Sequence, residues 1–157
     1  MNPILKNLEE ADHSIQRASH LLNVTFPLLK HKEILLRITE EIKKSLLKQI
    51  NSILYYEHLN KRIKLSKDPK KNLKLFEKKL ARRYKVNIKE IKEILNLSKI
   101  QKESPVHILK EDKLILVSND LKQKIITKEV LKRYLNLTEN LFKTVKKNLI
   151  TRTPKEE

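Results

Sequence analysis

Three side chains suited to acid–base or phosphate chemistry share one face of the N-terminal segment. His13, Arg17 and His20 recur at helical spacing, opposite the apolar residues of the same segment. A histidine there could act as a general acid or base, and the arginine as a phosphate-binding cation. The two histidines lie about 10 Å apart along a helix axis, too far to share one metal ion. A solvated surface or part of a dimer interface explains the same pattern, and we favour that interpretation.

No metal or cofactor site is expected. Glu10 and His13 have the Glu-x-x-His spacing of di-iron bundles, but such sites need two of these pairs and two further glutamates in the core. This chain has one such pair, on the polar side of its helix. Cysteine is absent, which excludes thiol nucleophiles, disulfides and cysteine-based metal sites. We therefore expect a protein that is not an enzyme, with the face around His13, Arg17 and His20 as the weakest catalytic alternative.

Positive charge is concentrated in the middle of the chain. Residues 61–103 contain sixteen Lys and Arg against five Asp and Glu, whereas residues 1–60 have a net charge of only +1. A uniform compositional bias would not leave the first sixty residues nearly neutral. Five cations fall within an arc of about 80° and about 20 Å of predicted helix; they are Lys71, Lys74, Lys78, Arg82 and Lys85. Four more precede them, namely Lys61, Arg62, Lys64 and Lys67.

Such a surface could follow a phosphate backbone. It has no interleaved exposed aromatic residues for base stacking, so we expect it to contact backbone and not sequence. The first hypothesis is a nucleic-acid-binding module, with RNA favoured over DNA. A second interpretation is that these cations are only the solvated outer face of a lysine-rich helix. A third is that they bind an anionic membrane or an acidic protein surface.

Composition sets further limits. The chain has 157 residues, a formal net charge of +17 and no glycine. Without glycine it cannot form the glycine-rich loops that bind nucleotide phosphates, and we expect no loop that needs a positive φ. No apolar run approaches the roughly 18 residues that cross a membrane, and no secretory signal is recognisable. We expect a cytoplasmic protein.

The pattern of apolar residues predicts a mainly α fold, a single bundle domain over residues 1–150. A bundle of four or five helices is expected. The candidate helices are one from Asn2-Pro3 that Pro27 kinks or ends, a second over about 32–60, a third after Asp68-Pro69, a fourth from Asn87 to Ser104-Pro105, and a last one after Thr127. A β-hairpin over about 106–117, with 124–126 as a possible third strand, precedes the last helix. Residues 151–157 form a polar tail.

The second helix has the broadest apolar arc. More than half of its circumference is apolar, which predicts a central helix that is covered on two sides or buried in a dimer. Gln49 and Tyr56 fall within that arc. We expect a core amide and a core tyrosine there, and a polar pocket between helices is the alternative. The second functional hypothesis follows from this helix: a protein-interaction or homodimerisation module without a nucleic-acid role.

One stretch resembles a known family. The residues His20-Leu21-Leu22-Asn23-Val24-Thr25-Phe26-Pro27-Leu28, followed at helical distance by Ser52-Ile53-Leu54-Tyr55-Tyr56-Glu57, are similar to small archaeal proteins of the HEPN superfamily. The resemblance covers about the first sixty residues. It implies a four-helix up-and-down bundle that often dimerises and acts in RNA metabolism, defence or toxin–antitoxin pairs, in some cases with a nucleotidyltransferase partner.

The chain departs from that family at the catalytic motif. Active members carry an arginine followed, after four to six residues, by a histidine on the third long helix. Here Arg17 and His20 are separated by two residues, and Arg82-Arg83 is followed by no histidine before His107. The resemblance therefore transfers a fold and no catalytic residue.

Overall fold

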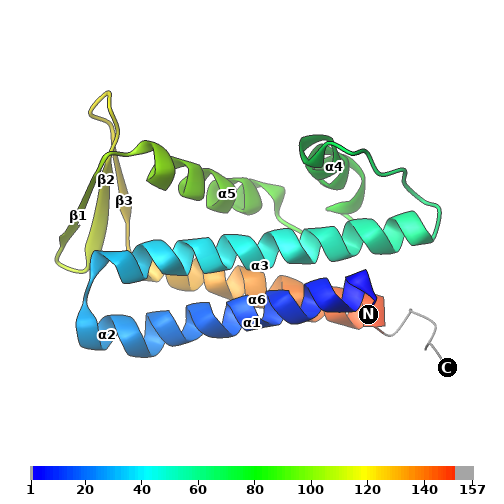
Figure 1. Ribbon diagram of the computed structural model, residues 1–157, viewed down its shortest axis with the longest axis horizontal. Coiled ribbons are helices and arrows are strands. Elements are labelled where there is room, and N and C mark those ends of the chain that lie inside the picture. The colour runs from blue at the N-terminus through cyan, green and yellow to red at the C-terminus, as the bar shows by residue number, and fades with distance from the viewer. Residues whose placement is uncertain (1, 151–157) are drawn as a thin grey trace.

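The computed structural model describes residues 2–150, in which four long helices run in alternating directions along the long axis (Figure 1). These are α1 (Pro3–His20), α3 (Lys32–Leu59), α5 (Ile88–Glu103) and α6 (Lys128–Ile150). Two short helices, α2 (Phe26–Leu29) and α4 (Pro69–Leu75), and a three-stranded sheet complete the fold. The mainly helical fold with a small β element is thus confirmed; the predicted tail, 151–157, lies outside the described residues.

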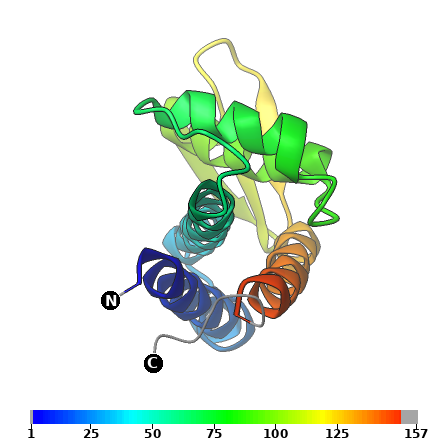
Figure 2. The same cartoon turned by 90° about the vertical axis from the view of Figure 1, so that its right-hand side faces the viewer.

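Helix α3 lies at the centre of the molecule. It packs against α1, α5 and α6, and Figure 2 shows α1, α3 and α6 grouped around a common axis with α5 and α4 above α3. These three neighbours account for the broad apolar arc of α3, so a dimer is not needed to bury it. Within this core Gln49 is buried and donates from Nε2 to the Thr138 carbonyl at 3.2 Å, but its Oε1 has no hydrogen-bond partner within residues 2–150, so the expected core amide is satisfied only in part.

The first helical segment changes its hydrogen bonding before Pro27 and continues to Leu29. Asn2 caps α1, its Oδ1 accepting from the Ile4 amide at 2.9 Å. In a regular α-helix the Pro27 ring would clash with the carbonyl four residues earlier. The chain instead forms a π-helical turn, η1 (Leu21–Thr25), before α2 completes the helical segment. Lys30 then ends it in the left-handed conformation.

The sheet is antiparallel, with β2 (Lys113–Val117) between β1 (Val106–Lys110) and β3 (Gln123–Ile126). The third strand is confirmed. On one face Leu114, Leu116 and Ile126 are buried. On the other face Ile108, Ile115 and Ile125 align across the three strands.

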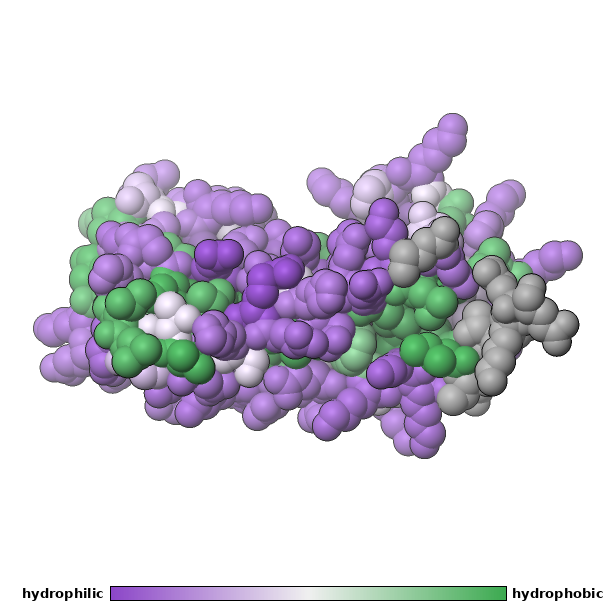
Figure 3. Space-filling model, turned by 60° about the horizontal axis from the view of Figure 1, so that its bottom comes forward, coloured by the Kyte–Doolittle hydropathy of each residue, from purple (hydrophilic) through white to green (hydrophobic). Residues whose placement is uncertain are grey.

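Hydrophobic side chains are therefore exposed at one end of the molecule. Ile108 and Ile125 are 46% and 50% exposed on the sheet, and Leu28 of α2 is 78% exposed. Figure 3 shows hydrophobic residues at this end and a second hydrophobic group nearer the other end, with hydrophilic residues between them.

The expectation that no loop has a positive φ is wrong. Six residues of the described chain have φ between 50° and 61°; they are Lys30, Lys61, Lys85, Glu111, Asp112 and Leu121. Lys61 and Lys85 each follow a helical turn that closes with a pair of backbone hydrogen bonds. Lys85 donates to the Arg82 carbonyl at 3.2 Å, and Val86 donates to that of Ala81 at 2.9 Å. This is the Schellman geometry usually formed by glycine, and its hydrogen bonds offset the cost of the left-handed lysine.

Lys85→Gly should therefore stabilise the protein. Removing the side chain relieves the strain of the left-handed conformation, but glycine has greater freedom in the unfolded chain. The difference is a net gain of about 1 kcal/mol in the free energy of unfolding. For a protein of this size that raises Tm by about 2–4 °C. The measurement is thermal unfolding followed by circular dichroism.

The matched control is Lys143→Gly, because Lys143 is an exposed lysine inside α6. There glycine should lower the unfolding free energy by about 1 kcal/mol. If both variants were destabilised equally, Lys85 would not be strained.

Candidate nucleic-acid interface

The cation-bearing helix predicted after Asp68-Pro69 is not a continuous α-helix. Asp68 caps it as expected, with its Oδ1 accepting from the Lys70 amide at 3.0 Å. After α4, however, a π-helical turn, η2 (Phe76–Leu80), leads into a turn over 81–85. The Ala81 amide donates to the Phe76 carbonyl, five residues back, so the chain contains one more residue per turn here. The regular 80° arc predicted for the five cations therefore does not hold at Arg82 and Lys85.

The predicted apolar side of this segment is nevertheless confirmed. Phe76, Leu80 and Tyr84 are buried, and Leu73 is half-buried against the same core. Figures 1 and 2 together show α4 lying across the long helices near the C-terminal end of α3. The opposite side of the segment, which carries the cations, faces solvent.

We call residues 61–85 the basic segment. It contains twelve Lys and Arg and two Asp and Glu. Both acids are engaged, Asp68 as the cap of α4 and Glu77 in an ion pair with Lys92 of α5 at 3.6 Å. Eight of the nine predicted contact residues are exposed and form no ion pair within residues 2–150; they are Lys61, Lys64, Lys67, Lys71, Lys74, Lys78, Arg82 and Lys85.

The ninth predicted residue, Arg62, is held by a buried carboxylate. Glu57 of α3 is fully buried, and its Oε2 lies 3.2 Å from Nη1 of Arg62 and 2.9 Å from Nη1 of Arg83. Its Oε1 accepts from the hydroxyl of Tyr84 at 3.0 Å. One carboxylate thus attaches both ends of the basic segment to the C-terminal end of α3.

The backbone reinforces this attachment. The Arg62 amide donates to the Glu57 carbonyl at 3.0 Å, and the Lys61 amide to that of His58 at 3.0 Å. Arg62 therefore contacts Glu57 through both its main chain and its side chain. Burial, and then the charge of Glu57, raises the pKa of the Tyr84 hydroxyl, so Tyr84 stays protonated and remains a donor to the carboxylate.

Glu57 was not identified from the sequence, although its position carried a signal. Leu46, Ile50 and Ile53 precede it at steps of four, three and four, so an acidic residue occupies the next core position of the helix. A buried carboxylate requires cationic or hydrogen-bonding partners. Arg62, five residues after Glu57, is the cationic partner that the sequence could have suggested.

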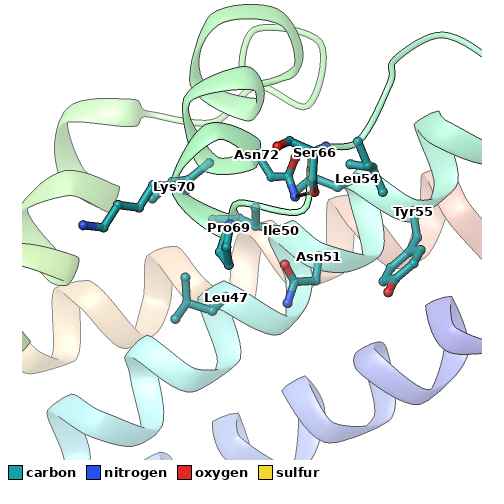
Figure 4. Close-up of a pocket in the computed structure, with 11 residues that line it drawn as sticks. Leu47, Ile50, Asn51, Leu54, Tyr55, Ser66, Pro69, Lys70 and Asn72 are labelled. Atoms are coloured by element: carbon teal, nitrogen blue, oxygen red, sulfur yellow. Dashed lines mark hydrogen bonds between the residues drawn. The ribbon is translucent and has the colours of Figure 1, made fainter.

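A groove lies beside the basic segment (Figure 4). It has a volume of about 450 Å³ and runs between the C-terminal half of α3 and the beginning of α4. Its α3 wall includes Leu47 and the exposed Asn51 and Tyr55. On the facing wall Ser66 and Asn72 fix each other, because the Ser66 amide donates to Asn72 Oδ1 at 2.8 Å and Asn72 Nδ2 donates to the Ser66 carbonyl at 2.9 Å.

Tyr55 supplies an aromatic side chain on the α3 side of this groove, outside the helix for which the sequence predicted no exposed aromatic residue. Its side chain is 42% exposed at the rim of the groove. The prediction of no exposed aromatic residue concerned only the helix that carries the cations. Tyr55 comes from α3 and reaches this surface only because α4 crosses that helix.

The other predicted polar face is placed elsewhere. His13, Arg17 and His20 are exposed on α1, and Arg17 forms an ion pair with Glu41 at 3.1 Å. Glu10 forms an ion pair with Lys48 at 2.7 Å, and its hydrogen bond to that lysine lowers the pKa of Glu10. Glu10 is thus engaged with a cation and not paired with His13. Among residues 2–150 no cluster of three or more His, Cys, Asp or Glu could hold a metal ion.

Comparisons with family models, with curated proteins and with solved structures find no match for this chain. None of the helices over residues 2–150 combines the length and the apolar character needed to cross a membrane. Function must therefore be inferred from the surface itself.

Proposed function

We propose that this protein is a non-catalytic module that binds RNA through phosphate contacts on the basic segment. The observation that carries the proposal is the excess of ten positive charges over residues 61–85, with eight exposed cations that form no ion pair within the described chain. Cations that neutralise phosphates release condensed counterions, and this release drives sequence-independent binding. The attachment of the segment to Glu57 holds these cations on one part of the surface.

The groove favours single-stranded RNA over a duplex. Unpaired bases can leave their stack and lie on an aromatic side chain, whereas bases in a duplex are already stacked. Tyr55 and the free amide of Asn51 lie on the α3 side of this groove, and Lys70 lies on the α4 side. We propose that the phosphates lie along the basic segment and that one base enters the groove.

The resemblance to HEPN bundles forms part of the same proposal. The alternating directions of α1, α3, α5 and α6 are in keeping with an up-and-down bundle. RNA binding by a member without the Arg and His of the ribonuclease motif is also in keeping with that resemblance. A cytoplasmic setting, with or without an archaeal origin, fits an RNA ligand.

Chemical protection of lysines tests the location of the RNA. The protein is acetylated with and without a twelve-nucleotide oligouridine, and modified lysines are identified by mass spectrometry. Protection should concentrate on the seven predicted lysines of the basic segment. The exposed Lys132, Lys143 and Lys146 of α6 serve as controls and should react equally in both samples. Uniform protection, or protection confined to α6, would contradict the proposal.

Replacement of Tyr55 by alanine should weaken the binding of single strands selectively. Loss of one base-stacking contact is worth about 1–3 kcal/mol, or roughly 5- to 150-fold in Kd. Binding of a DNA duplex through phosphates alone should be unchanged. Fluorescence anisotropy measures both. Tyr55→Phe keeps the ring and should bind like the wild type; an equal loss for Tyr55→Phe and Tyr55→Ala would argue against stacking.

Self-association is a second candidate function, favoured by the outer face of the sheet. Ile108, Ile115 and Ile125 form an aligned apolar row on the solvent side of the strands. Such faces pack on one another at about 10 Å, and one face can pair with its own copy about a two-fold axis. Sedimentation velocity of wild type and Ile108→Lys tests this: a wild-type dimer that Ile108→Lys dissociates is expected, and a wild-type monomer at micromolar concentration would contradict it.

A further inference from the structure

A second polar hollow lies between α1 and α3, apart from the basic segment. Its volume is about 420 Å³, and it is lined by His13, Gln16, Arg17, His20, Leu21 and Arg37. Four of these six side chains are cationic or become so on protonation. They belong to the first sixty residues, whose net charge is only +1, so general lysine enrichment does not explain the cluster.

The two arginines have different roles in this hollow. Arg17 is held in place: its Nε lies 3.1 Å from Glu41 Oε2, and its Nη2 donates to Ser14 Oγ at 3.2 Å. These contacts leave Nη1 of Arg17 available. Arg37, which α3 contributes, makes no ion pair or side-chain hydrogen bond within residues 2–150, so its guanidinium can turn toward a ligand.

Two carboxylates near the hollow are already engaged. Glu41 is bound to Arg17, and Asp12 Oδ2 accepts from Gln16 Nε2 at 3.0 Å. Nothing in the described chain neutralises Arg37 or occupies the ring nitrogens of His13 and His20 through a hydrogen bond. Glu9 and Glu33, one helical turn before His13 and Arg37, form no ion pair within residues 2–150, but neither of them lines the hollow.

The hollow lies where α1 passes into a π-helical turn. His20 is the last residue of α1, and Leu21 is the first residue of the π-helical turn η1. Leu21 adds an apolar wall to the hollow, which suits an organic group attached to an anion.

We propose that this hollow binds the phosphate group of a small phosphomonoester. Guanidinium groups donate two parallel hydrogen bonds to phosphate oxygens, and imidazoles add further donors. The volume exceeds that of a lone phosphate and is sufficient for a small organic ligand. The phosphate could also arrive as the free anion, and the experiment separates these two sources.

Histidine resonances provide a local readout of binding. The chain has five histidines, of which His31, His58 and His107 do not line the hollow. Adenosine 5′-monophosphate, inorganic phosphate and adenosine are titrated at pH 7 while the ring Cε1–Hε1 signals are followed by NMR. The monophosphate should shift His13 and His20 saturably and leave the other three unchanged. Inorganic phosphate should shift the same two signals more weakly, and adenosine should shift neither.

Arg37→Gln removes the free guanidinium and should raise the Kd of the monophosphate about ten- to hundredfold. Arg37→Lys keeps the charge but not the paired donors, so its Kd for the monophosphate should lie between those of the wild type and Arg37→Gln. The control Arg133→Gln alters an exposed arginine of α6 and should bind like the wild type.

Equal shifts of all five histidines, an unaltered Kd for Arg37→Gln, or equal shifts with adenosine would each overturn the proposal. If inorganic phosphate bound as tightly as the monophosphate, the site would be one for the free anion and the ester assignment would be wrong. Neither outcome depends on RNA binding at the basic segment.

Discussion

The triple variant Lys74→Glu, Lys78→Glu, Arg82→Glu should lose RNA binding almost entirely. It replaces three phosphate-binding cations by three anions in the middle of the basic segment. Since each charge-assisted contact contributes about 1.5 kcal/mol or more, the loss of three such contacts should raise Kd by about 10³-fold or more. All three side chains are exposed, so the circular dichroism spectrum should remain that of the wild type.

A charge-matched control makes this result specific. Lys132→Glu, Lys143→Glu, Lys146→Glu changes the net charge by the same amount on exposed positions of α6. This control loses only long-range attraction to the RNA. At salt concentrations where charges more than about 10 Å apart are screened, that loss should reduce affinity by no more than about tenfold. Equal losses in the two triple variants would show that net charge, and not the basic segment, governs binding.

Glu57→Ala should have the largest effect on stability. The change leaves the Tyr84 hydroxyl buried without its acceptor and removes the carboxylate shared by Arg62 and Arg83. Breaking a buried pair costs about 3–5 kcal/mol, and the lower end applies because both arginines are half exposed. We expect a loss of about 3 kcal/mol in the free energy of unfolding, measured by urea denaturation.

Glu57→Gln separates charge from hydrogen bonding. Its amide oxygen can still accept from Tyr84, but it no longer carries the charge that binds the two arginines. The loss in the free energy of unfolding should be about half of that for Glu57→Ala. A Glu57→Ala protein within about 1 kcal/mol of wild type would contradict the view that this residue fastens the basic segment to α3.

Local signals in the sequence were reliable because they depend on contacts over a few residues. Asp68 and Asn87 cap their helices through side-chain oxygens that accept from amides two or three residues later, and Thr127 does the same for Val130. Pro27 interrupts its helix through its own ring. These effects require no knowledge of the tertiary structure.

Other features depend on contacts that spacing does not reveal. The π-helical turn η2 preserves the burial of Phe76, Leu80 and Tyr84, so the apolar pattern alone could not distinguish it from a regular helix. Glu57 contacts Arg83 across 26 residues of sequence. The place of Tyr55 depends on the direction in which α4 crosses α3, which no local pattern specifies.

The lysines with positive φ show a different limit. The absence of glycine correctly excludes glycine-rich nucleotide loops, but it does not exclude left-handed residues. At Lys61 and Lys85 the closing backbone hydrogen bonds outweigh the strain of a side chain at that position. The expectation that a chain without glycine has no residue with positive φ was wrong, because hydrogen bonds can offset the cost of that conformation.

The salt dependence of RNA binding tests the central claim most directly. Anisotropy titrations of a labelled twelve-nucleotide oligouridine are made at about 50 and 200 mM salt. If about six phosphates are neutralised, affinity should fall by about 10²–10³-fold, with a slope in log Kd against log salt near 4. The triple variant of the basic segment should reduce that slope by about two, since each lost contact with a single strand removes about 0.7. Absence of binding at 50 mM salt, or an affinity that salt does not change, would contradict phosphate-led RNA binding.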